Sequence, residues 1–285
     1  MDSLLTPAAL RIEHVYYSWD SQNYSLEDID VTIHDNEFTA IIGQNGAGKS
    51  TLLKNITGLL RPSRGSIYIR GKNAREMTVP QIAAETGFVM QNPDRQLFSA
   101  TVYDEVSFAL KNVGLAEREI RRRTEESLET VGLSGQRDAF PPALGRGDRT
   151  KTVIAAVLAM GSKIIILDEP VAGQDYSGSR RIMDIAAELR EKGRTIIIVT
   201  HNIAMAAEYA RRILVMHEKR IYMDGRPEAV FCRFEELAKA NILPPPVARL
   251  SRELQKELPL ERIAMTTEEL ARMLINLKKK QAGGT

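Results

Sequence analysis

The chain has 285 residues, of which 43% are hydrophobic and 27% charged, a mixture typical of a globular protein with a substantial buried core. Its formal net charge is only +2, which argues against the strongly basic surface of a nucleic-acid-binding protein. The single cysteine, Cys232, excludes an intramolecular disulfide and is consistent with a reducing compartment. Residues 1–14 lack the pattern of a signal peptide, and no apolar run approaches the roughly 20 residues that cross a membrane as a helix. We therefore expect any membrane association to depend on partner proteins.

The N-terminal part of the chain predicts strands followed by a helix. Residues 10–17 and 26–33 alternate between apolar and polar side chains, and residues 37–42 form a short apolar run that a glycine closes. After that glycine the apolar residues 52–59 follow a helical spacing, and residues 65–71 indicate a further strand between turns.

The second half of the chain predicts a buried parallel sheet. Residues 101–140 are expected to be mostly helical. The runs 163–168 and 195–200 are continuously apolar with a helical pattern between them, which is typical of strands covered on both faces. A hairpin over 212–216 and 220–225 follows. The sequence thus predicts an α/β domain over residues 1–233.

A proline run, Pro244 to Pro246, indicates a linker or rigid turn, and two amphipathic segments follow it. We therefore predict a small C-terminal domain over residues 234–285 and assign it to subunit pairing.

The segment 43–51 reads GQNGAGKST and fits the phosphate-loop pattern G-x-x-x-x-G-K-[ST]. Its glycines let successive backbone N–H groups turn around an anion, and the helix that follows presents its positive end. Lys49 is expected to reach the β- and γ-phosphates, and the Ser50 hydroxyl to ligate Mg²⁺. The candidate nucleotide-binding residues of this loop are Gly43, Asn45, Gly46, Ala47, Gly48, Lys49, Ser50 and Thr51.

Polar side chains also follow the two apolar strands of the second half. Asp168 and Glu169 come at the end of the first, where open α/β sheets place their ligands. Asp168 suits the coordination shell of a metal ion, and Glu169 suits the general base that activates a water molecule. His201 follows the second strand and is therefore expected at the same edge of the sheet, contacting the γ-phosphate and orienting Glu169.

Residues 86–110 narrow the field of nucleotide-binding proteins. They resemble the Q-loop region of ABC ATPases, and the sequence QNPDRQLF from Gln91 is similar to that of energy-coupling-factor (ECF) importers. Residues 170–175 resemble the D-loop, with Asp175 at the aspartate position. The resemblance extends over residues 10–233 in unbroken order, and residues 257–270 resemble the C-terminal extension of the family more weakly.

The resemblance implies an ABC-type P-loop NTPase fold, with a RecA-like parallel sheet, an antiparallel β subdomain and a helical subdomain. It implies ATP and Mg²⁺ as cofactors, with Ser50, Gln91 and Asp168 on the metal side, and Gln91 also sensing a transmembrane partner. An aromatic side chain that stacks on adenine falls at Trp19, with Tyr17 as the alternative. Such stacking contributes about 1–3 kcal/mol.

One motif departs from the pattern of the family. The ABC signature usually reads LSGGQ, and the residues at that place are Leu144, Gly145, Arg146, Gly147 and Asp148. Gly145 lacks the serine hydroxyl that would donate to a γ-phosphate, and a charge-assisted bond of that type contributes about 1.5–3 kcal/mol. Asp148 adds negative charge beside the expected phosphate. Arg146 could pair with the phosphate or block the site, and the sequence leaves both open.

These motifs lead to a functional hypothesis. The chain is expected to bind and hydrolyse ATP in an ECF-type importer of a vitamin or transition-metal ion, on the cytoplasmic face of the cell membrane. Its expected partners are a second ABC ATPase subunit in a heterodimer, a transmembrane T component and a substrate-binding S component, and no nucleic acid. The resemblance implies that two such subunits pair and that each ATP lies between the phosphate loop of one subunit and the signature of the other.

Two alternatives remain open. The departures at Gly145 and Asp148 are also consistent with a nucleotide-switched scaffold that turns over little ATP. A soluble ABC protein of chromosomes or ribosomes is the other, although the chain lacks long coiled-coil insertions and a tandem cassette. A P-loop GTPase is disfavoured because no N-K-x-D motif occurs.

Overall fold

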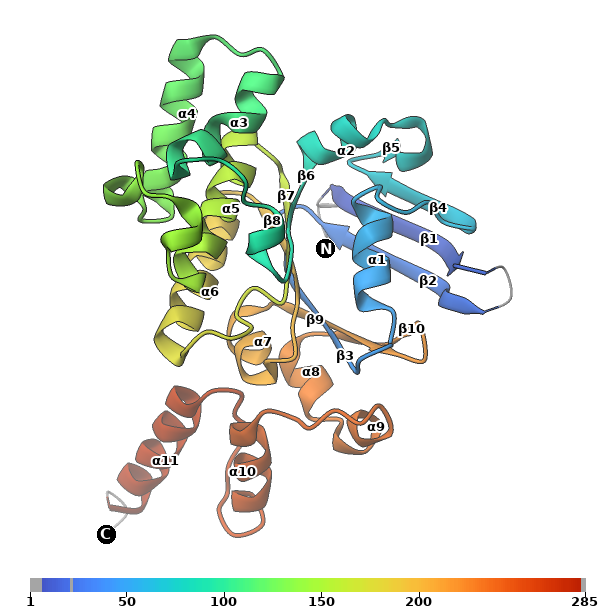
Figure 1. Ribbon diagram of the computed structural model, residues 1–285. Coiled ribbons are helices and arrows are strands. Elements are labelled where there is room, and N and C mark those ends of the chain that lie inside the picture. The colour runs from blue at the N-terminus through green and yellow to red at the C-terminus, as the bar shows by residue number, and fades with distance from the viewer. Residues whose placement is uncertain (1–6, 21–22, 283–285) are drawn as a thin grey trace.

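Two β-sheets make up the fold together with helices that cover both faces of the larger sheet (Figure 1). The structure is a computed structural model in which residues 7–20 and 23–282 are described, so the first six residues of the segment read for a signal peptide lie outside it. The strands are β1 (Ala8–Ser18), β2 (Tyr24–His34), β3 (Phe38–Gly43), β4 (Arg64–Ile69), β5 (Lys72–Asn73), β6 (Thr86–Val89), β7 (Ile164–Asp168), β8 (Thr195–Val199), β9 (Arg212–His217) and β10 (Arg220–Gly225). The α-helices are α1 (Lys49–Ile56), α2 (Val79–Glu85), α3 (Val102–Asn112), α4 (Glu117–Thr130), α5 (Arg146–Met160), α6 (Tyr176–Glu191), α7 (Ile203–Tyr209), α8 (Pro227–Phe231), α9 (Phe234–Lys239), α10 (Pro246–Leu254) and α11 (Thr267–Ala282).

The larger sheet has the strand order β10-β9-β3-β8-β7-β6. The pairs from β9 to β6 are parallel, and β10 is added to β9 as an antiparallel edge strand. The smaller sheet is antiparallel, with the order β2-β1-β4-β5. A parallel core with a separate antiparallel sheet and a helical region confirms the fold class predicted from the sequence.

The central strands are buried on both faces, because their side chains alternate between two hydrophobic cores. In β3, Phe38 and Ile42 face the core shared with α3 to α7, whereas Ile41 faces the core shared with α1 and the antiparallel sheet. Every residue of β8 is buried, which explains why its sequence reads as a continuous apolar run. Each fully buried Ile or Leu contributes about 1.5–3 kcal/mol, so these strands form a rigid base for the loops at their ends.

The helical region consists of α3, α4 and α5, which pack on one another (Figure 1). Helix α3 begins where the Thr101 hydroxyl accepts a hydrogen bond from the amide of Asp104 at 3.0 Å. Helix α5 ends at Gly161, which takes the left-handed backbone conformation with φ of 88° that favours glycine. The segment 101–140, predicted to be mostly helical, contains the two helices α3 and α4, which pack against the longer α5.

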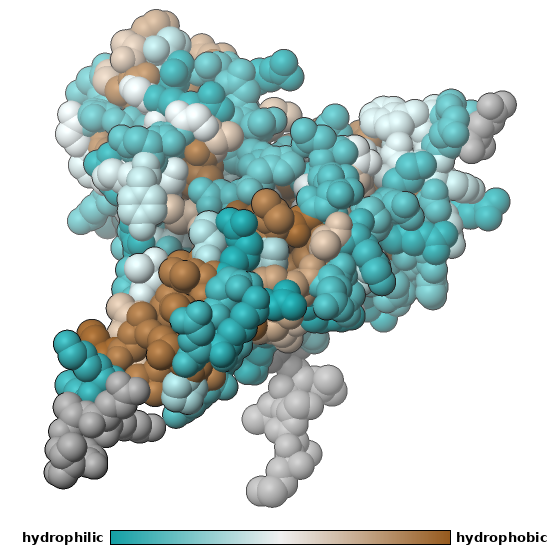
Figure 2. All heavy atoms as spheres, turned by 90° about the horizontal axis from the view of Figure 1, so that it is seen from below, coloured by the Kyte–Doolittle hydropathy of each residue, from teal (hydrophilic) through white to brown (hydrophobic). Residues whose placement is uncertain are grey.

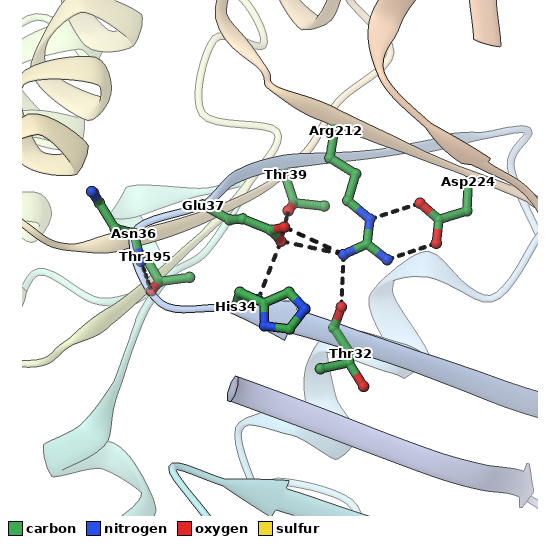
Figure 3. A network of polar contacts seen from close by, with 8 residues as sticks. All are labelled: Thr32, His34, Asn36, Glu37, Thr39, Thr195, Arg212 and Asp224. Carbon is green, nitrogen blue, oxygen red and sulfur yellow. Dashed lines mark hydrogen bonds and ion pairs between the residues drawn. The ribbon is translucent and has the colours of Figure 1, made fainter. Parts of the chain in front are cut away.

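Arg212 joins the two sheets (Figure 3). Its guanidinium donates to both carboxylate oxygens of Asp224 on β10, at 2.7 and 2.6 Å. The same group donates to the carbonyl of Thr32 on β2 at 2.7 Å and lies 3.3 Å from the Glu37 carboxylate, just before β3. One side chain therefore connects β9 and β10, at the edge of the larger sheet, with the residue before β3 and with the antiparallel sheet.

The C-terminal helices continue from the main core. Leu237, Ile242 and Ala248 belong to the same hydrophobic cluster as the helical region, whereas Leu260 and Leu270 belong to a small cluster of their own. Figure 2 shows hydrophobic side chains along this unit, where Leu243, Leu250 and Ile275 are exposed. The predicted division at residue 233 stays a prediction. Within the described part of the chain, no helix is long and apolar enough to span a membrane.

Candidate functional site

A polar cavity of about 330 Å³ opens at the carboxyl ends of the parallel strands. Its walls come from the loops after β3, β6, β7 and β8, together with two residues from other parts of the chain. The lining residues are Ser25, Asn45, Gly46, Gly48, Lys49, Ser50, Thr51, Gln91, Asp168, Glu169, Val199, His201 and Lys219. The structure thus brings together most of the predicted site residues, although they are far apart in the sequence.

The loop after β3 is held in a tight turn by close backbone contacts. Gly48 has a φ of 99°, and a Cβ on it would lie 2.6 Å from the carbonyl oxygen of Ser25. A Cβ on Gly43 would lie 2.4 Å from the carbonyl oxygen of Met216. Both positions therefore require glycine. Gly43 and Ala47 shape this loop, and neither lines the cavity.

Helix α1 begins at Lys49, directly after this turn. Its N-cap residue, Gly48, has no side chain to satisfy the first N–H groups of the helix. These donors and the positive end of the helix dipole favour an anion at this place. The ammonium group of Lys49 donates to the carbonyls of Gly43 and Gln44 at 2.7 and 2.8 Å. Burial lowers the pKa of Lys49, while the negative charges of Glu169 and Asp168 oppose that shift.

The two carboxylates at the end of β7 are largely withdrawn from solvent. Burial raises the pKa of Asp168, against the opposing charge of Lys49. Burial also raises the pKa of Glu169, which is only 8% exposed. Glu169 has a φ of 48°, a left-handed conformation that is uncommon for a residue with a side chain. Its amide donates to the carbonyl of Val199 at 2.8 Å, which holds this strained residue at the cavity.

His201 lies beside Glu169 after β8. The amide of His201 donates to Oε2 of Glu169 at 3.2 Å, and its Nε2 lies 3.2 Å from Oε1 without an aligned hydrogen bond. The imidazole is about half exposed, whereas the glutamate is buried. The histidine can therefore contact both the carboxylate and a ligand in the cavity.

The loop that carries Gln91 is braced by a second glutamine. The side chain of Gln96 accepts from the amide of Met90 at 2.7 Å and donates to the carbonyl of Phe88 at 2.9 Å. The Asn92 side chain accepts from the amide of Asp94 at 3.2 Å, which starts a short 3₁₀ turn. These contacts fix the backbone on both sides of Gln91, whose side chain lines the cavity.

Two predicted ligand contacts lie outside this cavity. Trp19 is 61% exposed and packs edge-on against Tyr17, with ring centroids 5.1 Å apart. Asp175 caps α6, where its Oδ1 accepts from the amide of Gly178 at 2.6 Å. The adenine contact and the D-loop role of these residues stay predictions.

The signature residues also lie away from the cavity, at the start of α5. Leu144 packs on the main core, and Gly145 is the N-cap of the helix. Arg146 donates to the carbonyl of Gln91 at 3.1 Å. Asp148 is paired with Lys151 at 3.0 Å and accepts from Gln136 at 3.3 Å. The charged side chains that depart from the usual motif therefore have partners within the chain itself.

Arg146 also approaches the residues 170–175. A Cβ on Gly173 would lie 3.4 Å from its Nη1, and one on Gly147 would lie 3.2 Å from Oε1 of Gln174. The start of α5 is thus fitted closely against both the Gln91 loop and this segment.

Sequence reasoning missed Ser25 and Lys219, which line the cavity from β2 and from the β9–β10 turn. Neither belongs to a motif, so only the tertiary fold identifies them. Gln96 was part of a quoted motif, and its bracing contacts give a reason for its place there.

A second cavity of about 610 Å³ meets the first at Gln91, Glu169 and His201. Its other wall includes Pro244 and Arg249 from the C-terminal part of the chain. The C-terminal part therefore reaches the back of the site.

Comparisons with known proteins agree with this geometry. A family model described as ABC transporter matches residues 26–172. The energy-coupling factor transporter ATP-binding protein EcfA of Methanocaldococcus jannaschii is 36% identical over 271 residues, covering 94% of this chain and 97% of that protein. Among other relatives, the chain spans only 41%, 43% and 42% of the length of three ABC transporter ATP-binding proteins that are 38%, 38% and 37% identical.

Two solved structures are also similar. The chain matches cbiO1 of Clostridium perfringens, described as part of the ABC transporter complex cbiONQ, with a TM-score of 0.77 and 36% identity over 87% of this chain and 99% of that one. It matches a dimeric ATP-binding cassette in a post-hydrolysis state with ADP and Pi, with a TM-score of 0.68 and 26% identity over 76% of this chain and 98% of that one.

Proposed function

From the premise that the chain belongs to the family of ABC transporter ATP-binding proteins, we propose that it binds and hydrolyses Mg²⁺-ATP to drive an ECF-type importer. The observation that carries the proposal is the convergence of the phosphate loop, Asp168, Glu169, Gln91 and His201 on one cavity. Each group has a distinct part in the cycle.

ATP binding rests on the loop before α1. Its N–H groups and the α1 dipole favour the triphosphate, and Lys49 exchanges its two carbonyl partners for phosphate oxygens. The buried position of Lys49 makes this exchange favourable, because a cation in a site of low polarity gains more from a strongly charged partner than from carbonyl dipoles.

The residues around the cavity fit Mg²⁺. No cluster of three or more His, Cys, Asp or Glu side chains that could hold a metal ion occurs among the described residues. Mg²⁺ is commonly held by one or two carboxylates together with substrate phosphates, and the cavity offers Asp168, the Ser50 hydroxyl and the Gln91 amide oxygen. The ion would neutralise phosphate charge as it develops during hydrolysis.

Glu169 is the proposed general base. Its carboxylate lies at the wall of the cavity. Its raised pKa is closer to neutral pH than that of an ordinary glutamate, which favours general-base catalysis. His201 holds this carboxylate through its amide and presents its imidazole to the γ-phosphate. Such a base contributes about 10²–10⁴ to the rate.

The second nucleotide-binding partner is proposed to be a different ABC ATPase. In a homodimer, each of the two nucleotide sites would contain an altered signature. In a heterodimer, the site that contains Glu169 would have the intact signature of the partner. The similarity to a cassette solved as a dimer supports face-to-face pairing. The C-terminal helices, with exposed Leu250 and Ile275, are proposed to add to that pairing (Figure 2).

The membrane partner is proposed to dock in a groove of about 360 Å³ beside β6. Leu59 and Val79 are exposed there, and Met160 lines the wall that α5 provides. The groove also contains Met90, which precedes Gln91, and Gln96, which braces the Gln91 loop. An apolar helix of a T component would therefore act directly on this loop. The similarity to a subunit of the cbiONQ complex supports this partner.

The cargo is proposed to be a micronutrient captured by a separate S component, with this chain at the cytoplasmic face of the membrane. Purification of the complex from membranes tests the assembly. Leu59→Asp should abolish co-purification with the membrane-embedded subunit while ATP affinity is retained. Unchanged co-purification would contradict docking at this groove.

ATP binding itself is tested with the isolated chain by calorimetry. We expect Lys49→Ala to weaken Mg²⁺-ATP about 10- to 100-fold, because a charge-assisted bond to phosphate is lost. Lys72→Ala, at an exposed position on β5, is the matched control and should bind like the wild type. A wild-type chain without measurable ATP affinity would contradict the proposed function.

One observation favours a second candidate, a nucleotide-switched scaffold. Asp148 and Gly145 remove favourable contacts to a partner's phosphate, which lowers the turnover that this signature can support. A single-turnover assay of the assembled complex separates the candidates, because a scaffold would bind ATP without forming ADP.

A further inference from the structure

The turn between β9 and β10 has an uncommon backbone. His217 pairs with Arg220, so the hairpin is closed by the two residues Glu218 and Lys219. Both have positive φ angles, of 45° and 67°. Two-residue hairpins often need this geometry, and Asn-Gly or Gly-Gly usually supplies it because side chains disfavour left-handed backbone. A lysine at the second position is therefore kept at a conformational cost, which points to a role for its side chain.

The turn is fixed against β2. The amide of Glu27 donates to the carbonyl of Lys219 at 2.9 Å. The carboxylate of Glu27 lies 3.1 Å from Arg220 but 3.8 Å from the ammonium of Lys219. Arg220 is thus the closer partner of Glu27. The Lys219 ammonium can therefore move to a ligand while the Glu27 carboxylate keeps its ion pair with Arg220. At the other end of the hairpin, Arg212 ties β9 and β10 to β2 (Figure 3).

Lys219 lines the same cavity as the phosphate loop. In the strand order β10-β9-β3-β8-β7-β6, the phosphate loop follows β3 and the turn lies on the β9 side of it. Gln91, Glu169 and His201 follow β6, β7 and β8 on the other side. The hydrolysis machinery and Lys219 therefore flank the phosphate loop from opposite sides.

The charges of the cavity favour a role for Lys219 in binding an anion. The formal charges of Lys49, Asp168 and Glu169 sum to −1, and Lys219 brings the sum for the cavity to zero. A nucleotide phosphate chain is strongly anionic, and lysine binds phosphate as a flexible point charge.

We propose that Lys219 is a nucleotide-binding residue that contacts the phosphates nearer the nucleoside, opposite Glu169. This inference rests on the proposed function, because it takes ATP as the ligand of the cavity. Since the contact lies away from the γ-phosphate, it supports ATP and ADP equally.

The experiment measures dissociation constants of Mg²⁺-ATP and Mg²⁺-ADP, and the melting temperature, for the isolated full chain. Lys219→Gly relieves the strained backbone and Lys219→Gln keeps a side chain of similar length. We expect both to weaken ATP and ADP by about fivefold, as loss of a partly exposed ion pair would. Lys219→Gly should at the same time raise the melting temperature, because glycine adopts the turn without strain.

Glu218→Gly is the matched control, since it relieves the same turn but its exposed side chain does not line the cavity. It should raise the melting temperature and leave both affinities within about twofold of the wild type. Opposite changes in stability and affinity distinguish a binding role from a structural one.

Wild-type affinity for both nucleotides in the two Lys219 variants would overturn the inference while leaving ATP binding by the chain intact. A loss confined to ATP would overturn the placement on the nucleoside side. A wild-type chain that binds neither nucleotide would instead contradict the proposed function.

Discussion

Around the phosphate loop, side chains from four loops turn into one cavity, whereas at the start of α5 the polar side chains pair with their own chain. In the first region Lys49, Asp168 and Glu169 line the cavity, although Lys49 and Glu169 also have partners within the chain. In the second, Asp148 is paired with Lys151, and Arg146 with a backbone carbonyl. Under the proposed function, this contrast means that the chain supplies a full set of groups for one nucleotide and an altered set for the other.

The two regions are nevertheless in contact. Arg146 donates to the carbonyl of Gln91, so the signature segment touches the loop whose side chain lines the cavity. Arg149 strengthens this connection through an ion pair with Asp94 at 2.7 Å. A change of the Gln91 loop is therefore expected to reach the start of α5.

The largest expected effect breaks the first region. Glu169→Gln in the assembled complex should lower ATP turnover by about 10²–10⁴, because the amide cannot accept a proton from water. Steady-state phosphate release measures this, and ATP affinity serves as the control that the site is still formed. Near-normal turnover would show that hydrolysis does not depend on this region.

A smaller effect repairs the second region. The triple change Gly145→Ser, Arg146→Gly and Asp148→Gln restores the usual motif, and two copies of the repaired chain would form two complete sites. We expect ATP turnover of the purified chain to rise about 10- to 100-fold, because a charge-assisted bond to the γ-phosphate is regained.

Adding Glu169→Gln to the triple variant should lower its turnover by about 10²–10⁴, to the wild-type level or below it, which excludes a contaminating ATPase. Equal ATP turnover by the wild type and the triple variant would show that the altered signature residues do not limit hydrolysis.

The smallest effect concerns stability in the nucleotide-free chain. Burial raises the folded-state pKa of Glu169 above its model value of 4.5, so the folded protein holds the proton more tightly than the unfolded chain. The wild type therefore loses stability as pH rises from that value through the raised pKa, and Glu169→Gln does not. We expect the variant to melt at a higher temperature than the wild type at pH 8.

The difference should vanish below pH 4.5, where the carboxyl is protonated in both states. Glu188→Gln, at an exposed position on α6, is the control and should follow the wild type at every pH. A variant less stable than the wild type at pH 8 would mean that the carboxylate stabilises the empty site.

The sequence predicts the parallel core well because burial on both faces leaves a local mark. The runs at β7 and β8 are apolar at nearly every position. Gly43 and Gly48 are required because a Cβ on either would clash with a backbone carbonyl oxygen. The place of Asp168 and Glu169 at the sheet edge follows from the end of β7 alone.

Other features depend on contacts between distant segments and leave no local mark. Lys219 reaches the cavity because β10 lies beside β2, a tertiary contact across almost the whole domain. The pairing of Arg146 with Gln91 depends on how α5 packs beside the loop after β6. Likewise, the proline run indicated a linker or rigid turn, but it did not indicate that Pro244 lines the cavity behind His201.

The Arg212 network has a mechanical consequence. One guanidinium contacts β2 and β10 from β9 and also lies against Glu37. The antiparallel sheet and the base of the phosphate loop are therefore expected to move as one rigid body. Amide hydrogen exchange in β2 and β9 should then be the same with and without nucleotide. Motion driven by ATP is expected instead in α3 to α5, which the Arg212 network does not contact.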